Sequence, residues 1–452
     1  MRGRRGRIGV LIGIIALGGS PAVRGDSPDA AAERGRKALT ERGYLAPAWS
    51  LDAYKNAGRL WGGAAPDPDR DPEGYAAAFN RRYGLHPAPY PNDGLPMGLR
   101  RAEDPDGSKA GIQLDCMVCH GGSIGGSSYV GLGNTQLDFQ ALLSDLNRAG
   151  GKFAPPPLFT LNTARGTNNA GQMSVALLSL RNADLSRRRF PRLLGANLPE
   201  LDTPAWWILG KKATKYYDGR TDARAARSNM QFLLGELSLQ QLQELEPTFR
   251  DIDSYLKSLT PPKYPFPIDR ARAERGEAIF TRTCARCHGT HGPEGSYPNR
   301  IVPLDVIGTD PARALGLSDR LVAHYNSTWF AGDYPVDEEM TGYQAPPLDG
   351  IWATAPYLHN GSVPTLSNLL KSPTRPARFR RPPSTDFAHY DREHVGWTFE
   401  LVGEPPDPAL PVHEARFLYD TSRFGLGNGG HTFGDGLSED ERMDVIEYLK
   451  TL

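Results

Sequence analysis

All four cysteines of this 452-residue chain lie in two copies of one motif, Cys-x-x-Cys-His. Two thiols about one helical turn apart can add to the vinyl groups of a haem, and the adjacent imidazole can then bind the iron. A zinc site or a redox dithiol needs no histidine at this position. The pattern therefore predicts two covalently attached c-type haems. The attachment residues would be Cys116, Cys119, Cys284 and Cys287, and the proximal iron ligands His120 and His288.

The residue on the opposite face of each iron would decide what the haem can do. An iron with two strong axial ligands transfers electrons, whereas a five-coordinate iron can bind oxygen or peroxide. None of the ten histidines lies between His120 and His288, so the first motif has no histidine after it in its own part of the chain. We therefore expect an open or water-bound first iron. The alternatives are ligation by a methionine (Met173, Met230 or Met97) or by His86.

For the second iron the sequence offers a late histidine. His431 lies in a glycine-rich stretch, residues 429–434, just before the last helical pattern. Flexible glycines let the backbone approach a flat cofactor closely, and a packed helix would hold such a loop in place. We predict His431 as the distal ligand. The alternatives are His359, Met340 or no ligand.

A short internal repeat divides the chain. Residues 251–259 recur as residues 444–452, with apolar residues at helical spacing in both copies. Each copy resembles the terminal helix of a cytochrome c domain. A second repeated segment, Ala-Glu-Arg-Gly at residues 32–35 and 273–276, opens a helical pattern in each half. We expect the glycine of the Ala-Glu-Arg-Gly segment to allow a close crossing with the terminal helix.

These repeats predict the domain organisation. The proline-rich residues 261–267 form a stiff linker between the two halves. We predict a mainly α fold of two cytochrome c-type domains, each around a covalently bound haem and each with long loop-rich insertions. The first domain would span residues 26–260 and the second residues 261–452. A content of 50 Gly and 39 Pro agrees with such a loop-rich chain.

The N-terminus has the features of an export signal. Residues 1–25 contain a basic start, an apolar stretch from Ile8 to Leu17 and small residues after it. The apolar stretch is too short to span a bilayer comfortably. We expect a cleaved signal peptide, no stable membrane span, and a periplasmic or secreted protein. Covalent haem attachment outside the cytoplasm agrees with this expectation.

The charge balance gives no sign of a nucleic-acid partner. Five of the 52 basic residues lie in residues 1–25, which leaves 47 basic against 52 acidic residues in the remainder. Because binding to nucleic acid depends on basic clusters that neutralise phosphates, and no basic tract indicates such binding, we expect none.

Several segments resemble bacterial di-haem c-type cytochromes, a group of cytochrome c peroxidases, their methylamine-maturation relatives and the rubber oxygenases. Residues 355–362 are similar to the segment after the second haem motif of the peroxidases, where the histidine lies near the haem without binding its iron. In the rubber oxygenases the second haem is bis-histidine, with a late ligand that His431 would match, and the first haem binds oxygen. The segments that are more similar to the rubber oxygenases are 83–100, 116–120, 203–220 and 430–434.

Together these observations predict an exported di-haem oxidoreductase. The first haem would activate O2 or peroxide, and the second would pass electrons from a small redox partner protein or another donor. A pure electron-transfer cytochrome and a cytochrome c peroxidase are the alternatives. The catalytic residues are unknown, with Met173, Trp206 and Trp207 as candidates on the distal side of the first haem or between the haems.

The sequence also offers partners for the haem propionates and for the ligating histidines. We expect Arg165 and Arg220 to pair with haem propionates, because a guanidinium suits a carboxylate. A backbone carbonyl usually accepts a hydrogen bond from the far nitrogen of a ligating histidine, and Pro303 is the candidate for His288. The sequence leaves open the oligomeric state and a Ca²⁺ ion that bridges the domains.

Overall fold

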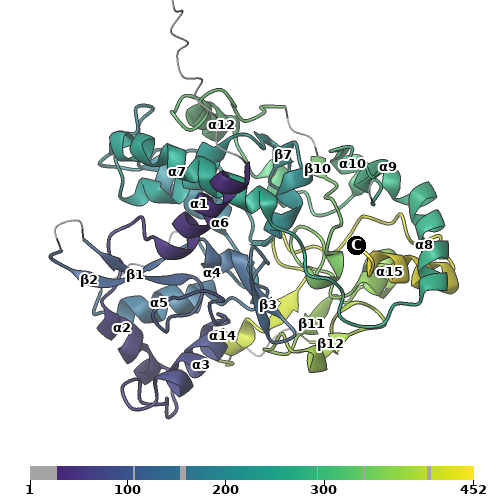
Figure 1. Ribbon diagram of the computed structural model, residues 1–452, viewed down its shortest axis with the longest axis horizontal. Helices are drawn as coiled ribbons and strands as arrows, with labels where there is room; N and C mark the ends of the chain where they lie inside the picture. The colour runs from purple at the N-terminus through teal and green to yellow at the C-terminus, as the bar shows by residue number, and fades with distance from the viewer. Residues whose placement is uncertain (1–27, 105–106, 153–158, 293, 340–341, 405–408) are drawn as a thin grey trace, which may run out of the picture.

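The computed structural model describes residues 28–104, 107–152, 159–292, 294–339, 342–404 and 409–452 (Figure 1). The predicted signal peptide, residues 1–25, and the candidate ligand Met340 lie outside these residues. About 39% of the chain is helical and the sheets are small. The expectation of a mainly helical fold is therefore confirmed.

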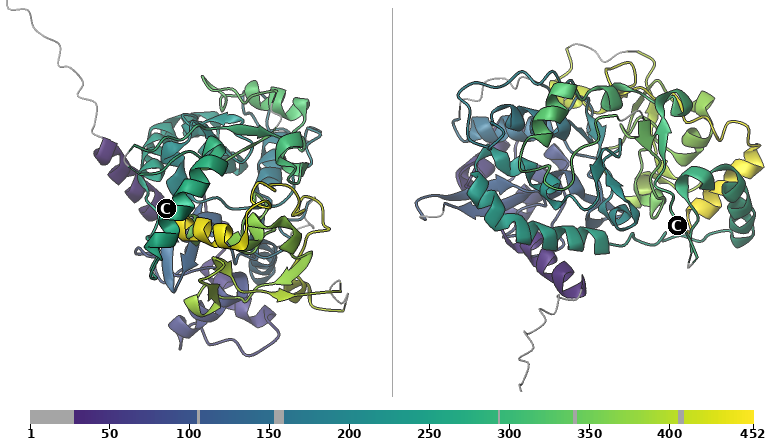
Figure 2. Two further views of the ribbon diagram at one scale, coloured as in Figure 1. Left: turned by 90° about the vertical axis from the view of Figure 1, so that its right-hand side faces the viewer. Right: turned by 90° about the horizontal axis from the view of Figure 1, so that it is seen from above.

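Two crossed helix pairs form the framework. Helix α1 (Pro28–Glu41) packs on α7 (Leu239–Ser258), and α8 (Arg270–Thr283) packs on α15 (Glu439–Leu449). Figure 2 shows the purple α1 and the yellow α15 in separate parts of the molecule, each beside its own teal partner. Helices α1 and α8 contain the Ala-Glu-Arg-Gly segments, and α7 and α15 contain most of the longer repeat. In each half the Ala-Glu-Arg-Gly helix therefore packs on the helix of the longer repeat.

Glycine makes both crossings possible. A Cβ atom on Gly35 would lie 2.0 Å from the carbonyl oxygen of Asp251, and one on Gly276 would lie 1.9 Å from that of Asp444. The arginine before each glycine then binds the side chain of the same aspartate, as the ion pairs Arg34–Asp251 and Arg275–Asp444 show, both at 2.8 Å. The same helix crossing, with its glycine contact and its Arg–Asp ion pair, therefore occurs in both halves of the chain.

Side-chain caps begin three of these four helices. Ser238 and Gln241 form a capping box at the start of α7, and Ser438 and Glu441 form the same arrangement at the start of α15. Asp269 accepts a hydrogen bond from the backbone of Arg272 at the start of α8. The caps satisfy backbone N–H groups that have no partner inside the helix.

Shorter helices fill the space between the framework pairs. The α-helices are α2 (Leu51–Asn56), α3 (Pro72–Tyr83), α4 (Met117–His120), α5 (Phe139–Ala149), α6 (Ala170–Ser179), α9 (Ala285–His288), α10 (Leu304–Ile307), α11 (Ala312–Leu315), α12 (Asp319–Asn326), α13 (Leu366–Leu370) and α14 (Val412–Ala415). The 3₁₀ helices are η1 (Ala57–Leu60), η2 (Trp206–Lys211), η3 (Ala226–Gly235), η4 (Ile351–Ala353), η5 (Ser372–Thr374) and η6 (Phe387–His389). The two very short helices α4 and α9 carry the histidines of the two motifs.

The strands form small antiparallel sheets that fasten the loops. Six pairs are β1 (Leu99–Glu103) with β2 (Ala110–Leu114), β3 (Gly121–Ile124) with β4 (Ser127–Val130), β5 (Thr167–Asn168) with β6 (Leu201–Asp202), β7 (Thr214–Lys215) with β8 (Thr221–Asp222), β9 (Ile301–Pro303) with β10 (Gly342–Gln344), and β12 (Tyr390–Asp391) with β13 (Gly396–Trp397). In a further sheet, β11 (Arg378–Arg380) lies between β14 (Glu400–Leu401) and β15 (Leu418–Asp420).

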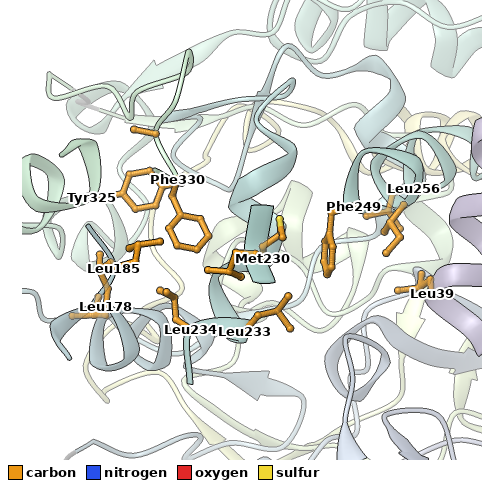
Figure 3. Packing of buried hydrophobic residues seen from close by; sticks show 14 of the residues in the cluster. Leu39, Leu178, Leu185, Met230, Leu233, Leu234, Phe249, Leu256, Tyr325 and Phe330 are labelled. Atoms are coloured by element: carbon orange, nitrogen blue, oxygen red, sulfur yellow. The ribbon is translucent and has the colours of Figure 1, made fainter. Parts of the chain in front are cut away.

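The apolar cores mix segments from both halves of the chain. One core places Tyr325 and Phe330 against Met230 and Phe249 (Figure 3). Another joins Trp207 to the framework helices α8 and α15. Side chains from both halves of the chain therefore share the same apolar cores. The predicted boundary between domains at residue 260 stays a prediction.

Candidate haem sites

The second motif lies at a cavity of about 220 Å³. Cys284, Cys287 and His288 line it on one side, and His431 lines it as well. The remaining wall is mainly apolar, with contributions from Phe280, Val302, Ile307, Leu366, Leu370, Val445 and Leu449. The structure therefore brings together the four residues that the sequence predicts for the second haem, in mainly apolar surroundings.

His288 is oriented by one hydrogen bond. Its Nδ1 atom donates to the carbonyl oxygen of Pro346 at 2.8 Å, which leaves Nε2 for a metal. Burial lowers the pKa of His288, so the imidazole is in the neutral form that binds metal ions. The expectation that Pro303 supplies the carbonyl is wrong. Pro303 pairs with Gly342 in the β9–β10 ladder, and the accepting carbonyl comes from the loop after β10.

His431 faces His288 across the cavity. The two ring centroids are 6.2 Å apart. Two metal–imidazole bonds of about 2.0–2.1 Å, plus the distance from nitrogen to ring centre on each side, add up to roughly 6 Å. The spacing therefore fits two imidazoles on opposite sides of one iron. Burial lowers the pKa of His431 to about 4.

The backbone around His431 is held in an unusual conformation. Gly430 has a φ of +72° and His431 a φ of +47°. A Cβ atom on Gly430 would lie 2.2 Å from the backbone of Gly308, and the His431 N–H donates to the carbonyl of Ile307 at 2.7 Å. Arg375 donates to the carbonyls of residues 428, 430 and 431. The glycines were visible in the sequence, whereas the role of Arg375 was not.

His359 lies in the same cavity but in a different setting. Its ring stacks on Tyr343 at 4.3 Å between centroids and meets Tyr217 edge-on at 6.1 Å. Burial lowers the pKa of His359 to about 3. The ring that contacts His288 is that of His431 and not that of His359, which favours His431 over His359 as the ligand opposite His288.

The first motif is fixed to the framework by a buried ion pair. Asp115 accepts a hydrogen bond from the backbone of Met117 at 2.9 Å and forms an ion pair with Arg100, also at 2.9 Å. Arg100 in turn donates to the carbonyls of Leu39 and Thr40 at the end of α1. A Cβ atom on Gly98 would lie 2.4 Å from the Cα of Val118. The loop before β1 thus positions helix α4.

His120 has an aromatic neighbour in place of a second imidazole. Its ring stacks on Trp206 with 4.3 Å between centroids and 20° between planes. Burial lowers the pKa of His120 to about 3, with a small opposing effect from the backbone of Pro204. Loss of hydration among the surrounding protein atoms raises the pKa of the Cys116 and Cys119 thiols to about 12. Part of Cys116 is nevertheless accessible at the surface.

Three of the alternative ligands for the first iron lie near the first motif and have contacts of their own. His86 accepts from the Ser123 hydroxyl at Nδ1, at 2.8 Å, and donates from Nε2 to the Asn134 amide oxygen at 3.2 Å. Met97 and Met230 are completely buried in one apolar core, in which Figure 3 labels Met230. Met173, on α6, packs against another apolar cluster that includes Val118 and Phe139.

The adjacent Trp206 and Trp207 belong to different cores. Trp206 stacks on His120 and donates its backbone N–H to the carbonyl of Gly131 at 2.7 Å. The indole of Trp207 donates to the carbonyl of Asp349 at 2.8 Å, within the second core. Residues 204, 205 and 208 line the second cavity. This segment therefore runs between the two motifs and touches both centres.

The two arginines expected at propionates bind backbone carbonyls. Arg165 donates from all three guanidinium nitrogens to the carbonyls of residues 136, 82 and 81. Arg220 donates to the carbonyl of Asp337 at 3.2 Å. Within the described ranges, no group of three or more His, Cys, Asp or Glu side chains is placed to hold a metal ion. The bridging Ca²⁺ stays a prediction.

Comparison with known proteins adds a family signal. A model of the family described as "RoxA-like, cytochrome c-like" matches residues 342–380, the segment that contains Pro346 and His359. The match points to a haem c-type cytochrome. It implies covalently bound haem c, in agreement with the motifs and with the cavity at His288.

Two proteins of Sinorhizobium fredii are similar to parts of the chain. The uncharacterized protein y4iM is 33% identical over 241 residues, which cover 44% of this chain and 53% of the relative. The uncharacterized protein y4iJ is 31% identical over 284 residues, which cover 47% of this chain and 44% of the relative. The chain thus spans about half the length of the curated relatives it matches.

Among solved structures, the hydrazine synthase of Kuenenia stuttgartiensis, pressurized with xenon, aligns with 66% of this chain and 95% of its own. The identity is 14% and the TM-score 0.23. A search for a helix long and apolar enough to cross a membrane finds none in the part of the chain that the structure describes.

Proposed function

We propose that this protein is an exported di-haem c-type oxidoreductase with two unequal centres. The first would be held by Cys116, Cys119 and His120 and would take O2 or peroxide. The second would be held by Cys284, Cys287, His288 and His431 and would pass electrons. When bound, the haems supply oxygen or peroxide chemistry at one iron and one-electron storage at the other. The chain's own part is to position, shield and tune them.

The contrast between the partners of His120 and of His288 carries this proposal. His431 lies opposite His288 at a spacing that fits one iron between the two rings. His120 has a stacked tryptophan at its ring, and the nearest histidine candidate, His86, uses both ring nitrogens in hydrogen bonds. In the residues that the structure describes, the second centre has a second histidine available and the first does not.

The residues at the second centre suit electron transfer without exchange of ligands. The Pro346 carbonyl fixes the tautomer of His288, and Arg375 ties down the loop that presents His431. The wall of the cavity is mainly apolar. A fixed ligand set in apolar surroundings undergoes little rearrangement when the charge on the centre changes, which favours electron transfer.

The residues at the first centre suit a neutral proximal imidazole with a fixed ring plane. Burial keeps His120 neutral, and the stack on Trp206 fixes the plane of its ring. Trp206 also belongs to the segment whose residues 204, 205 and 208 line the cavity at His288. We infer that electrons enter through the second centre from a small redox protein or another donor outside the cytoplasm, and reach the first through this segment.

Spectra of the purified holoprotein test the proposal. We expect two haems per chain, one high-spin and one low-spin in the oxidised state, and a carbon monoxide shift that involves one of the two after reduction. Two low-spin haems that ignore carbon monoxide would contradict the oxygen-binding role and leave a pure electron-transfer cytochrome. Rapid turnover of peroxide with a reduced cytochrome, without turnover of O2, would favour the peroxidase alternative.

A further inference from the structure

Three buried arginines meet at a small cavity apart from the two motifs. Arg165 precedes β5, Arg381 follows β11 and Arg416 follows α14. Their exposed fractions are 6%, 8% and 7%. Together with Gln136, Ala164, Phe379, Phe417 and Tyr419 they line a cavity of about 10 Å³. None of these residues lines the cavity at His288 and His431, so the small cavity is a separate site.

The positive charge around this cavity exceeds the negative charge. Asp138 is completely buried and lies 2.8 Å from Nε of Arg416, so it offsets one of the three guanidinium groups. Asp202 interacts electrostatically with Arg381 and can offset a second guanidinium group, so two carboxyl groups face three guanidinium groups. Because a buried charge without a counter-charge is costly, this arrangement calls for a further anion.

The hydrogen-bond donors point to the same conclusion. All three nitrogens of Arg165 donate to backbone carbonyls. Nη2 of Arg381 donates to the carbonyls of Thr135 and Arg165, at 3.0 and 3.2 Å. Nη1 of Arg381 is buried and has no acceptor among the described residues. A charged donor that is more than nine-tenths buried thus stands unsatisfied at the cavity wall.

We propose that this cavity binds one small monovalent inorganic anion of the halide class, with chloride as the physiological ligand and Arg381 as its main donor. The cavity has room for a single small particle, which excludes phosphate, sulfate and carboxylate side chains. A water molecule would satisfy Nη1 but would leave the excess positive charge. The anion would join Arg165 of the N-terminal half to Arg381 and Arg416 of the C-terminal half.

Bromide is the probe for the first test. Crystals of the holoprotein grown in bromide should show an anomalous peak at the bromine absorption edge inside the cavity, within hydrogen-bond distance of Nη1 of Arg381. A water-like density without anomalous signal would overturn the proposal, as would bromide found only at exposed arginines. This test needs no variant and does not depend on the activity of either haem.

Thermal unfolding of the holoprotein provides the second test. At constant ionic strength, exchange of gluconate for chloride should raise the melting temperature by about 2 °C, and the rise should saturate with chloride concentration. Arg381→Met should abolish the dependence, and Arg192→Met, at an exposed arginine, should retain it. An equal chloride effect in all three proteins, or none in the parent, would contradict the proposal. If Arg381→Met does not fold, the bromide experiment decides.

Discussion

The two motifs sit on the same helical framework and differ in the segment that precedes the terminal helix. Before α15, a glycine-rich loop carries His431 to a position opposite His288. Before α7, the 3₁₀ helix η3 buries Met230 in an apolar core. The helix crossing, the aspartate pairing and the capping box are repeated almost unchanged. The two copies of the helix crossing thus share their framework contacts and differ in the short segment before the terminal helix.

The crossing glycines give the largest expected effect and test whether the two frameworks are equivalent. Gly276→Ala places a Cβ atom 1.9 Å from the carbonyl oxygen of Asp444, and Gly35→Ala places one 2.0 Å from that of Asp251. Each change should lower the free energy of unfolding by about 2–4 kcal/mol, because two backbones must separate. Denaturant titration of the holoprotein measures the loss. Gly403→Ala, where no atom lies near the added methyl group, is the control.

The comparison would fail if only one of the two variants were destabilised. In that case the helix pair of the insensitive half would be a loose contact, and the sequence repeat would not reflect an equivalent structural role. A large loss in the Gly403→Ala control would instead indicate a general sensitivity to alanine.

Removal of His431 should erase the difference between the two centres. His431→Ala takes away the imidazole 6.2 Å from that of His288, so we expect the low-spin haem to become high-spin and to bind carbon monoxide after reduction. The carbon monoxide shift should then involve both haems, about twice the amplitude of the parent. His413→Ala, at a histidine outside both centres, should leave the spectrum unchanged.

A different result would reassign the ligand. If His431→Ala keeps one low-spin haem, the distal ligand is another residue, and His359→Ala becomes the decisive variant because His359 lines the same cavity. Binding of exogenous imidazole to His431→Ala, with return of the low-spin spectrum, would separate a lost ligand from a collapsed loop.

The two tryptophans test the link between the centres. Trp206→Phe weakens a stack on His120 worth about 0.5–1.5 kcal/mol, so we expect a shift in the reduction potential of the first haem and slower electron transfer between the haems. Trp207→Phe removes one hydrogen bond to the carbonyl of Asp349, worth about 1 kcal/mol of stability. It should leave the potential of the first haem unchanged. Spectroelectrochemical titration of both variants measures the two potentials.

Equal effects of the two substitutions on the first potential would remove the special role of Trp206. The pair is well matched, because the residues are neighbours in the chain, both are buried and each keeps an aromatic ring after the change. Any common effect of altered packing in η2 therefore appears in both.

Local patterns in the sequence predicted the parts of this structure that depend on few residues. The haem motifs, the crossing glycines and the loop of His431 each involve a short stretch with a physical requirement of its own. The partners of those residues come from distant segments and were missed. Pro303 was expected at His288, but the carbonyl belongs to Pro346, because antiparallel pairing of β9 and β10 brings the loop after β10 to the imidazole. No local pattern specifies such a contact.

Contacts between distant segments also explain why the surroundings of the first motif were not predicted. The stack of Trp206 on His120 joins residues 86 positions apart in the chain, and the ion pair of Arg100 with Asp115 depends on the register of β1 and β2. Arg165 was expected at a propionate because its type suits a carboxylate, yet three backbone carbonyls take its donors. Residue type predicts what a side chain can bind, and only the fold decides which partner it meets.

The smallest expected effect concerns His86, an alternative ligand for the first iron. Burial lowers the pKa of His86 to about 4, below the usual value of 6.5. The unfolded chain therefore takes up a proton between about pH 6.5 and pH 4 that the folded protein refuses, and the stability from neutral His86 is lost as the pH falls through this range. His86→Gln keeps a polar group beside Ser123 and Asn134 without a titrating ring, so unfolding should take up about one proton fewer.

His86→Gln also tests whether this residue approaches the iron. Both ring nitrogens are already used by Ser123 and Asn134, so the variant should keep the parent's spin states and its carbon monoxide shift. The slope of stability against pH between 6.5 and 4, measured by denaturant titration, should be the only property that changes. If the first haem instead changes its spin state, His86 exchanges its hydrogen bonds for the iron, and the two centres would both be closed by histidine.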